Sequence, residues 1–129
     1  MKLFLGTSAV VWAMSCVASA ADVTYDPAER TANGLFQLSG NWSTLQTGRS
    51  QLSLKVVDPS GQPATLATVK VDYDSVDMPM NPPNRPVAEL GAGKYEKPVE
   101  FGMPGVWKFK ITVKQGAVVD TLERRQNLR

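Results

Sequence analysis

A strict alternation of apolar and polar side chains runs through residues 107–114. Successive side chains of a β-strand point to opposite faces, so this pattern predicts a strand with one face on a core and the other in water. The apolar positions are Trp107, Phe109, Ile111 and Val113. The Met-Pro-Gly at residues 103–105 predicts a turn just before it, because Pro restricts φ and Gly allows a positive φ.

Shorter alternating runs separated by turn residues predict further strands and no helix. Asp58-Pro59-Ser60-Gly61 has the chemistry of a type I turn. Pro98 cannot donate a ladder hydrogen bond, so it predicts an edge or a bulge in its strand. About seven short strands with frequent turns are typical of an all-β antiparallel sandwich. The other expected strands cover residues 34–39, 50–58, 68–74, 87–90, 94–101 and 118–122.

The inward positions of these strands predict the hydrophobic core. Each expected core residue is an apolar or aromatic side chain on the apolar face of its strand. They are Phe36, Leu38, Leu52, Leu54, Val56, Val69, Val71, Tyr95, Trp107, Phe109, Ile111 and Val113.

The first twenty of the 129 residues predict a cleaved secretory signal peptide. Lys2 precedes an apolar run, and Ala18-Ser19-Ala20 fits a cleavage site after Ala20. Lipid attachment at Cys16 is an alternative, while the apolar run is shorter than the ~20 residues needed to span a bilayer. After cleavage we expect no transmembrane anchor, a leader over residues 21–33, one domain over 34–122 and a polar tail over 123–129.

Composition then excludes several classes of function. The mature chain has no Cys and no His, which removes disulfides, thiolate metal sites, a Cys nucleophile and any Ser-His-Asp triad. Without Lys2, the chain has thirteen basic and twelve acidic residues. Its net positive charge is therefore too small to favour nucleic-acid binding. We therefore expect a protein that is not an enzyme, with no catalytic residues and no organic cofactor.

The methionines form the one pattern that suggests chemistry. Met78, Met80 and Met103 are the only methionines of the mature chain, and each adjoins a proline in an expected loop. If each strand reverses direction, alternate loops emerge at the same end of the sandwich, so these loops and the one holding Trp42 would cluster. Thioethers are soft ligands that select Cu(I), and Trp42 could cap the ion by a cation–π contact.

Simpler interpretations stand beside this one. Methionine is a flexible side chain that fills gaps and packs against aromatic rings, so these residues could plug the end of the core. Trp42 could be a lid on the core or a contact for a partner. Asp72 and Asp74 share the outward face of one strand and match no calcium loop, which favours a solvated face.

The polar face of the strand predicted over residues 107–114 carries a row of lysines, Lys108, Lys110 and Lys114. Such a row discourages pairing of the strand with another sheet edge, or it could dock an acidic partner.

Several segments, in order, resemble one known family, and Gly-x-Gly-x-Tyr followed by Met-Pro-Gly-x-Trp is the most specific pair. The segments are Asn33–Phe36, Leu52–Val56, Asp58–Pro63, Val69–Val71, Met78–Met80, Leu90–Tyr95 and Phe101–Trp107. On these residues the chain is identified as a member of the YtkA-like domain family, related to the FixH family, over about Asn33 to Val119.

The resemblance implies a small extracytoplasmic immunoglobulin-like sandwich in bacteria. Such domains accompany periplasmic metal handling, copper efflux and respiratory-oxidase assembly. Family members often carry His in the loop corresponding to residues 76–85, where this chain has Asn81, Asn84 and Arg85. That departure leaves a thioether site, and the chain also lacks the membrane helix of FixH-type proteins.

Two functions follow as expectations. The first is a periplasmic accessory protein that binds Cu(I) through Met78, Met80 and Met103, in metal handling or respiratory-complex assembly. The second is a metal-free module whose proline-dense loop, residues 76–86 with four of the nine prolines, contacts a periplasmic or membrane protein. Ordering a proline-rich loop costs little entropy, which suits a preformed contact surface.

Overall fold

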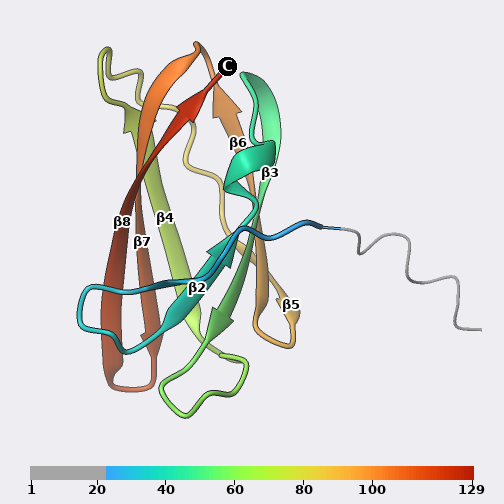
Figure 1. Cartoon of the computed structure of the whole chain (residues 1–129), viewed down its shortest axis with the longest axis vertical. Helices are drawn as coiled ribbons and strands as arrows, with labels where there is room; N and C mark the ends of the chain where they lie inside the picture. Colours follow the sequence, from blue (N-terminus) through green and yellow to red (C-terminus); the bar gives the residue numbers. More distant parts are fainter. Residues whose placement is uncertain (1–22) are drawn as a thin grey trace, which may run out of the picture.

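The computed structural model describes residues 23–129 (Figure 1). The predicted signal peptide, residues 1–20, and the alternative lipid-attachment site at Cys16 lie outside the described residues. Within residues 23–129, no helix has the length and apolar character that crossing a membrane requires.

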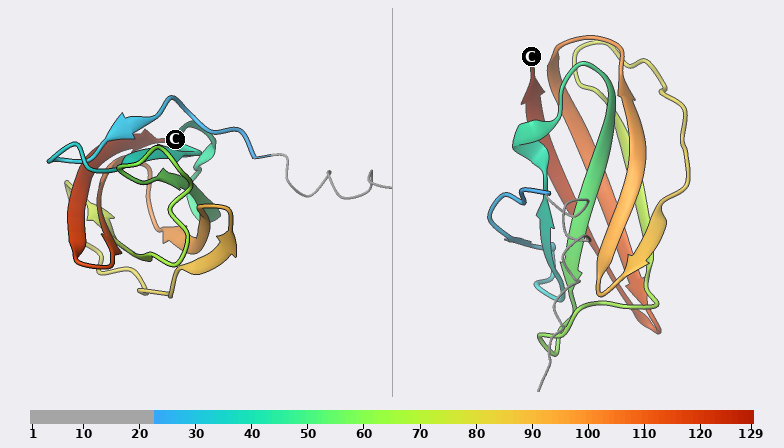
Figure 2. Two further views of the ribbon diagram at one scale, coloured as in Figure 1. Left: turned by 90° about the horizontal axis from the view of Figure 1, so that it is seen from below. Right: turned by 90° about the vertical axis from the view of Figure 1, so that its right-hand side faces the viewer.

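In the described residues, eight antiparallel strands form two sheets that face each other across one core (Figure 2). One sheet has the order β1-β2-β3-β6-β5 and the other the order β4-β7-β8. This confirms the predicted all-β sandwich. The strands are β1 (Glu29–Arg30), β2 (Gln37–Gly40), β3 (Gly48–Val57), β4 (Thr68–Ser75), β5 (Ala88–Gly91), β6 (Lys94–Phe101), β7 (Gly105–Gln115) and β8 (Val118–Leu128).

Strand β7 lies at the centre of the three-stranded sheet and carries the alternation seen in the sequence. Its inward residues, Trp107 to Val113, are each at most 1% exposed. Trp107 packs edge-on against Phe101 of β6, with ring centroids 5.0 Å apart, and Phe109 stacks on Tyr73 of β4 at 5.8 Å. Large aromatic surfaces from both sheets are thus buried against one strand, which stabilises the association of the sheets.

All twelve residues predicted for the core are buried. The alternation did not predict several other members of the core, because they lie in loops, at strand ends or on strands with a charged outer face. They include Trp42, Leu45, Ala64, Val99, Phe101, Leu122 and Leu128.

The predicted polar tail over residues 123–129 is wrong, because β8 continues to Leu128 and pairs with β7 up to Gly105. Leu128 is 2% exposed, and the carbonyl oxygen of Arg129 accepts a hydrogen bond from the Thr47 hydroxyl at 2.6 Å. The half-buried residues Arg124 and Gln126 are polar, as are the exposed residues beside them, so this half of β8 shows no alternation of apolar and polar side chains in the sequence.

Pro98 lies where one side of β6 has no strand beside it. On one side Pro98 aligns with Gln51 of β3. On the other side β5 pairs with β6 only between Gly91 and Ala88, which align with Lys94 and Glu96. The missing N–H of Pro98 is therefore tolerated at a local edge, as predicted.

The leader is part of the fold from Val23 onward. Its short strand β1 pairs with β2, and the residues after it contact Asp120 of β8 in the opposite sheet. The Asp120 carboxylate is 3% exposed and accepts hydrogen bonds from the Thr31 hydroxyl at 2.6 Å and the Asn33 amide at 2.9 Å. The leader thereby links the two sheets along one side of the sandwich.

We expect Asp120 to make stability depend on pH. Burial alone raises the pKa of Asp120, but hydrogen bonds from Thr31, Thr121, Asn33 and Leu35 outweigh it and hold the pKa below its ordinary value. A depressed folded pKa gives stability that is present above the unfolded pKa of about 3.9 and is lost as pH falls through the folded pKa.

Replacing the carboxylate leaves buried donors without a full set of acceptors, so Asp120→Asn should lower the free energy of unfolding by about 1–3 kcal/mol at pH 7. Urea denaturation from pH 7 to pH 2 measures this. The difference between wild type and variant should shrink below about pH 4, and a constant difference would contradict the assignment.

The strand assignment for residues 123–128 is tested by Leu128→Ala. Removing a buried leucine side chain should lower the free energy of unfolding by about 2–5 kcal/mol. The neighbouring Asn127 is exposed, so Asn127→Ala is the matched control and should change it by no more than about 0.5 kcal/mol. Equal effects of the two variants in urea denaturation would mean that this segment is a frayed tail after all.

Candidate functional site

Three connections meet at one end of the sandwich, called here the pole: residues 41–47 after β2, residues 76–87 after β4, and residues 102–104 between β6 and β7. Figures 1 and 2 show the first and third of these connections, and the start of the second, at the end where the C-terminus lies; the rest of the second connection runs along the side of the sandwich to β5. The register agrees, because Ser75 aligns with Trp107 and Gly48 aligns with Phe101. The predicted gathering of alternate loops at one end is therefore confirmed.

Asp74, at the end of β4, holds the loop that carries Met78 and Met80. Its carboxylate accepts hydrogen bonds from the amides of Met80 at 2.7 Å and Asn81 at 3.3 Å. Asn81 has a φ of 48°, in the left-handed region that asparagine tolerates. The Met80 amide is the main cause that lowers the pKa of Asp74, so the carboxylate is ionised at neutral pH and the loop is held in a defined turn.

Met80 rests on the backbone of Gly102. A Cβ added to Gly102 would lie 2.7 Å from the Met80 Cε and 3.2 Å from its sulfur. A glycine at this position is what allows the thioether to approach the turn so closely. Met80 remains 43% exposed, so part of its side chain lies at the surface of the pole.

Met103 follows Gly102 directly, with consecutive Cα atoms about 3.8 Å apart. Met103 is partly buried against the hydrophobic core, and its carbonyl oxygen accepts a hydrogen bond from the Trp107 indole N–H at 3.0 Å. The structure thus brings Met80 beside the turn that carries Met103, and a core residue fixes the backbone of that turn.

Met78 lies two residues before Met80 and is 59% exposed. Its amide donates a hydrogen bond to the Ser75 hydroxyl at 3.3 Å, which keeps the start of the loop close to the end of β4. Of the three predicted ligands, Met80 therefore contacts Gly102, the residue before Met103, while the Met103 side chain packs against the core, and Met78 lies at the same pole with a solvent-exposed side chain.

The predicted role of Trp42 as an exposed cap or a partner contact is wrong, because the structure buries it. The residue begins a short 3-10 helix (Trp42–Thr44) and is 2% exposed. Its ring packs edge-on against Phe109 at 5.0 Å, and the Arg124 guanidinium lies 4.9 Å from its centroid. Arg124 also pairs with Glu29, so Trp42 serves as a lid on the core, the other alternative offered by the sequence.

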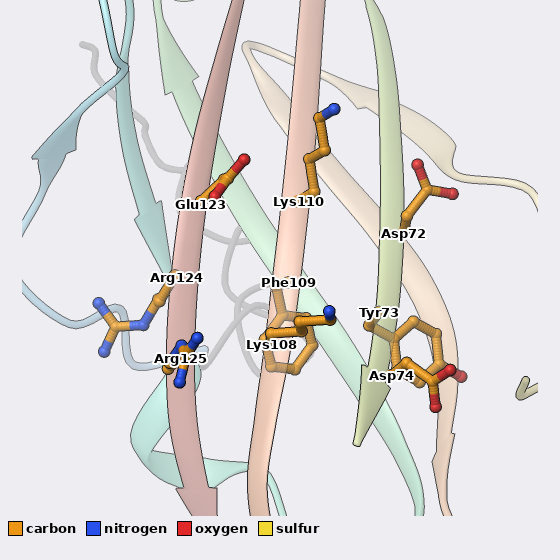
Figure 3. Close-up of a pocket in the computed structure, with 9 residues that line it drawn as sticks. All are labelled: Asp72, Tyr73, Asp74, Lys108, Phe109, Lys110, Glu123, Arg124 and Arg125. Atoms are coloured by element: carbon orange, nitrogen blue, oxygen red, sulfur yellow. The ribbon is translucent and has the colours of Figure 1, made fainter. Parts of the chain in front are cut away.

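The predicted lysine row lies on the outer face of the three-stranded sheet, where a cavity of about 680 Å³ opens (Figure 3). Lys108 and Lys110 of β7 align with Asp74 and Asp72 of β4. Charges of both signs therefore alternate across this face, which is solvated as expected for Asp72 and Asp74. A surface of mixed sign does not favour an acidic partner.

Lys97 is a buried polar residue that sequence reasoning missed. It is 1% exposed, and its ammonium donates hydrogen bonds to the Asn84 side-chain oxygen at 3.0 Å and to the Arg85 carbonyl oxygen. Burial lowers its pKa, while the charge of Asp72 opposes that shift. Its parity with Tyr95, two residues earlier and predicted inward, is the signal that would have found it.

Lys97 holds the later part of the proline-dense loop, at Asn84, and Asp74 holds its earlier part, at Met80. Within residues 23–129, no group of three or more His, Cys, Asp or Glu residues could hold a metal ion.

A family model described as YtkA-like matches residues 31–112. The chain belongs to the YtkA-like family. The match begins at Thr31, in the leader contact with Asp120, and ends within β7, so it contains all three methionines. No curated protein and no solved structure matches the chain.

The contact between Met80 and Gly102 can be tested by Gly102→Ala. The added Cβ should displace the flexible end of Met80, since it would lie under 3.0 Å from the Met80 Cε. Stability should fall by less than about 1 kcal/mol, because only an exposed side chain has to move. The Met80 methyl resonance, measured by carbon–proton NMR, should shift, and an unchanged resonance would contradict the contact.

Proposed function

We propose that this YtkA-like domain is a non-enzymatic accessory protein of the bacterial periplasm that binds Cu(I) at the pole. Met80 and Met103 are the primary ligands, and Met78 is a third. The observation that carries the proposal is the close contact of the Met80 thioether with Gly102, the residue directly before Met103. Thioether sulfur is a soft ligand, and a site made of such ligands prefers Cu(I) to harder divalent ions.

The loop is held in place before any ligand arrives, which supports the proposal. Asp74 fixes the amides of Met80 and Asn81, and Lys97 fixes the segment at Asn84 and Arg85. A loop that is already ordered loses little conformational entropy on binding. Both Met78 and Met80 have exposed side chains, which supports access by an ion delivered from solution.

The test is a competition titration of Cu(I) against a chromogenic Cu(I) chelator, without oxygen and at pH 7. Wild-type mature protein should withdraw Cu(I) from the chelator, and the double variant Met80→Leu/Met103→Leu should lose at least about tenfold in affinity. Leucine keeps the apolar volume, so folding should be preserved. Met78→Leu should have a smaller effect.

Thermal unfolding of the same variants serves as the control for folding. If the wild-type protein does not compete with the chelator, or if replacing all three methionines by leucine leaves the affinity unchanged, the copper proposal is wrong. Gly102→Ala provides an independent check, because it moves Met80 without removing any sulfur and should also weaken binding.

The exposed apolar surface of the pole favours one second candidate function. Met78 and Met80 are 59% and 43% exposed beside the proline-dense loop, and adaptable methionine side chains are frequent at protein-binding surfaces. In this alternative the pole contacts a periplasmic or membrane protein without metal. Cross-linking from Met78→Cys that captures the same partner with and without Cu(I), together with failure of the chelator competition, would favour it.

A further inference from the structure

The buried ammonium of Lys97 has no carboxylate within ion-pair distance in the described chain, where the ion pairs are Arg49–Glu100 and Arg124–Glu29. Its two hydrogen-bond acceptors are neutral: the Asn84 side-chain oxygen and the Arg85 carbonyl oxygen. An ammonium has three N–H donors, so one remains for another acceptor. Buried charges are normally paired, because removing an ion from water costs several kcal/mol.

Lys97 lines a cavity of about 230 Å³ that lies between β4 and the proline-dense loop. Two further cations, Lys70 and Arg85, line the same cavity, and Asp72 is its one acidic residue. The remaining walls are mainly apolar, from Val69 and Val71 of β4 and from Pro86 and Val87 of the loop. Three cations face one anion around a small, partly apolar cavity.

We propose that this cavity binds a small aliphatic carboxylate, with the carboxylate group on Lys97 and the short apolar tail against the valine and proline side chains. A charge-assisted hydrogen bond to a carboxylate is about twice as strong as a neutral one, and it gives the buried ammonium a directly bonded counter-ion, whereas Asp72 lines the cavity beyond ion-pair distance. Arg85 and Lys70 add favourable charge at the rim. The apolar walls favour a short carboxylate over a fully hydrated inorganic anion.

This site is separate from the methionines and does not depend on the proposed binding of Cu(I). None of the three methionines lines the cavity. Replacing Met80 and Met103 by leucine should therefore leave carboxylate binding unchanged, so the two proposals can fail independently.

The probe is propionate, added to the mature protein at pH 7 and constant ionic strength in place of chloride. Nitrogen–proton NMR should show saturating shifts of the Asn84, Arg85 and Val87 amides. 1-Propanol, which has a similar tail without the charge, should produce no saturating shift. Phosphate in a parallel titration distinguishes a carboxylate site from a general anion site.

Two variants test the charges directly. Lys97→Met keeps the length and apolar character of the side chain and should weaken propionate binding at least about tenfold. Lys94→Met on the same strand removes a lysine that does not line the cavity and should bind as wild type does. Asp72→Asn removes the one acidic group and should tighten binding by about twofold or more.

If Lys97→Met does not fold, the ammonium nitrogen resonance of Lys97 in the wild-type protein replaces that comparison. It should shift with the same saturation curve as the loop amides. Shifts that rise linearly with propionate, that persist in Lys97→Met or that appear equally with 1-propanol would overturn the proposal. Saturation by phosphate but not by propionate would also overturn the assignment to carboxylates.

Discussion

The structure depends on the burial of the inward side chains of β7 between the two sheets. Trp107 and Phe109 contact aromatic rings from β4, β6 and the short helix after β2. Burying aromatic surface is the largest favourable contribution that a domain of this size can draw on. Because Trp107 also donates a hydrogen bond to the Met103 carbonyl oxygen, the same contact that closes the core fixes the turn at the pole.

Polar groups hold the parts of the chain that this apolar contact does not reach. Asp120 attaches the leader to β8, Asp74 attaches the methionine-bearing loop to β4, and Lys97 attaches its far part to β6. Each is a charged group that meets backbone or amide partners at a place where no ladder of strand hydrogen bonds is available. Such groups give a loop one defined arrangement, since leaving a buried donor or acceptor unsatisfied is costly.

The proline-dense loop shows why these contacts matter for function. It contains no strand of its own between Ser75 and Ala88, yet it carries two of the three candidate thioether ligands and closes the cavity over Lys97. Hydrogen bonds to Asp74 and to Lys97 hold its first and last parts in place. The lack of a side chain on Gly102 leaves the room that Met80 occupies. The two proposed sites therefore share one loop while using different chemistry: thioether sulfur at the pole, and the buried ammonium of Lys97 of β6 in the cavity beside β4.

The sequence by itself determined the sandwich, the strand faces and the twelve predicted core residues, because alternation and turn chemistry are local properties. It also placed the methionine loops at one pole, since in antiparallel sheets every connection reverses the direction of the chain. Local patterns could not reveal the seat of Met80 on Gly102, which is a contact between distant parts of the chain.

Only the tertiary structure decided that Trp42 is buried, that Lys97 faces inward and that residues 123–128 form a strand. Trp42 is buried because Phe109 and Arg124 lie around it, and neither is close to it in sequence. Lys97 faces inward because the proline-dense loop offers it hydrogen-bond acceptors. The last half of β8 is a strand because β7 pairs with it along its whole length, a long-range interaction that outweighs its polar composition.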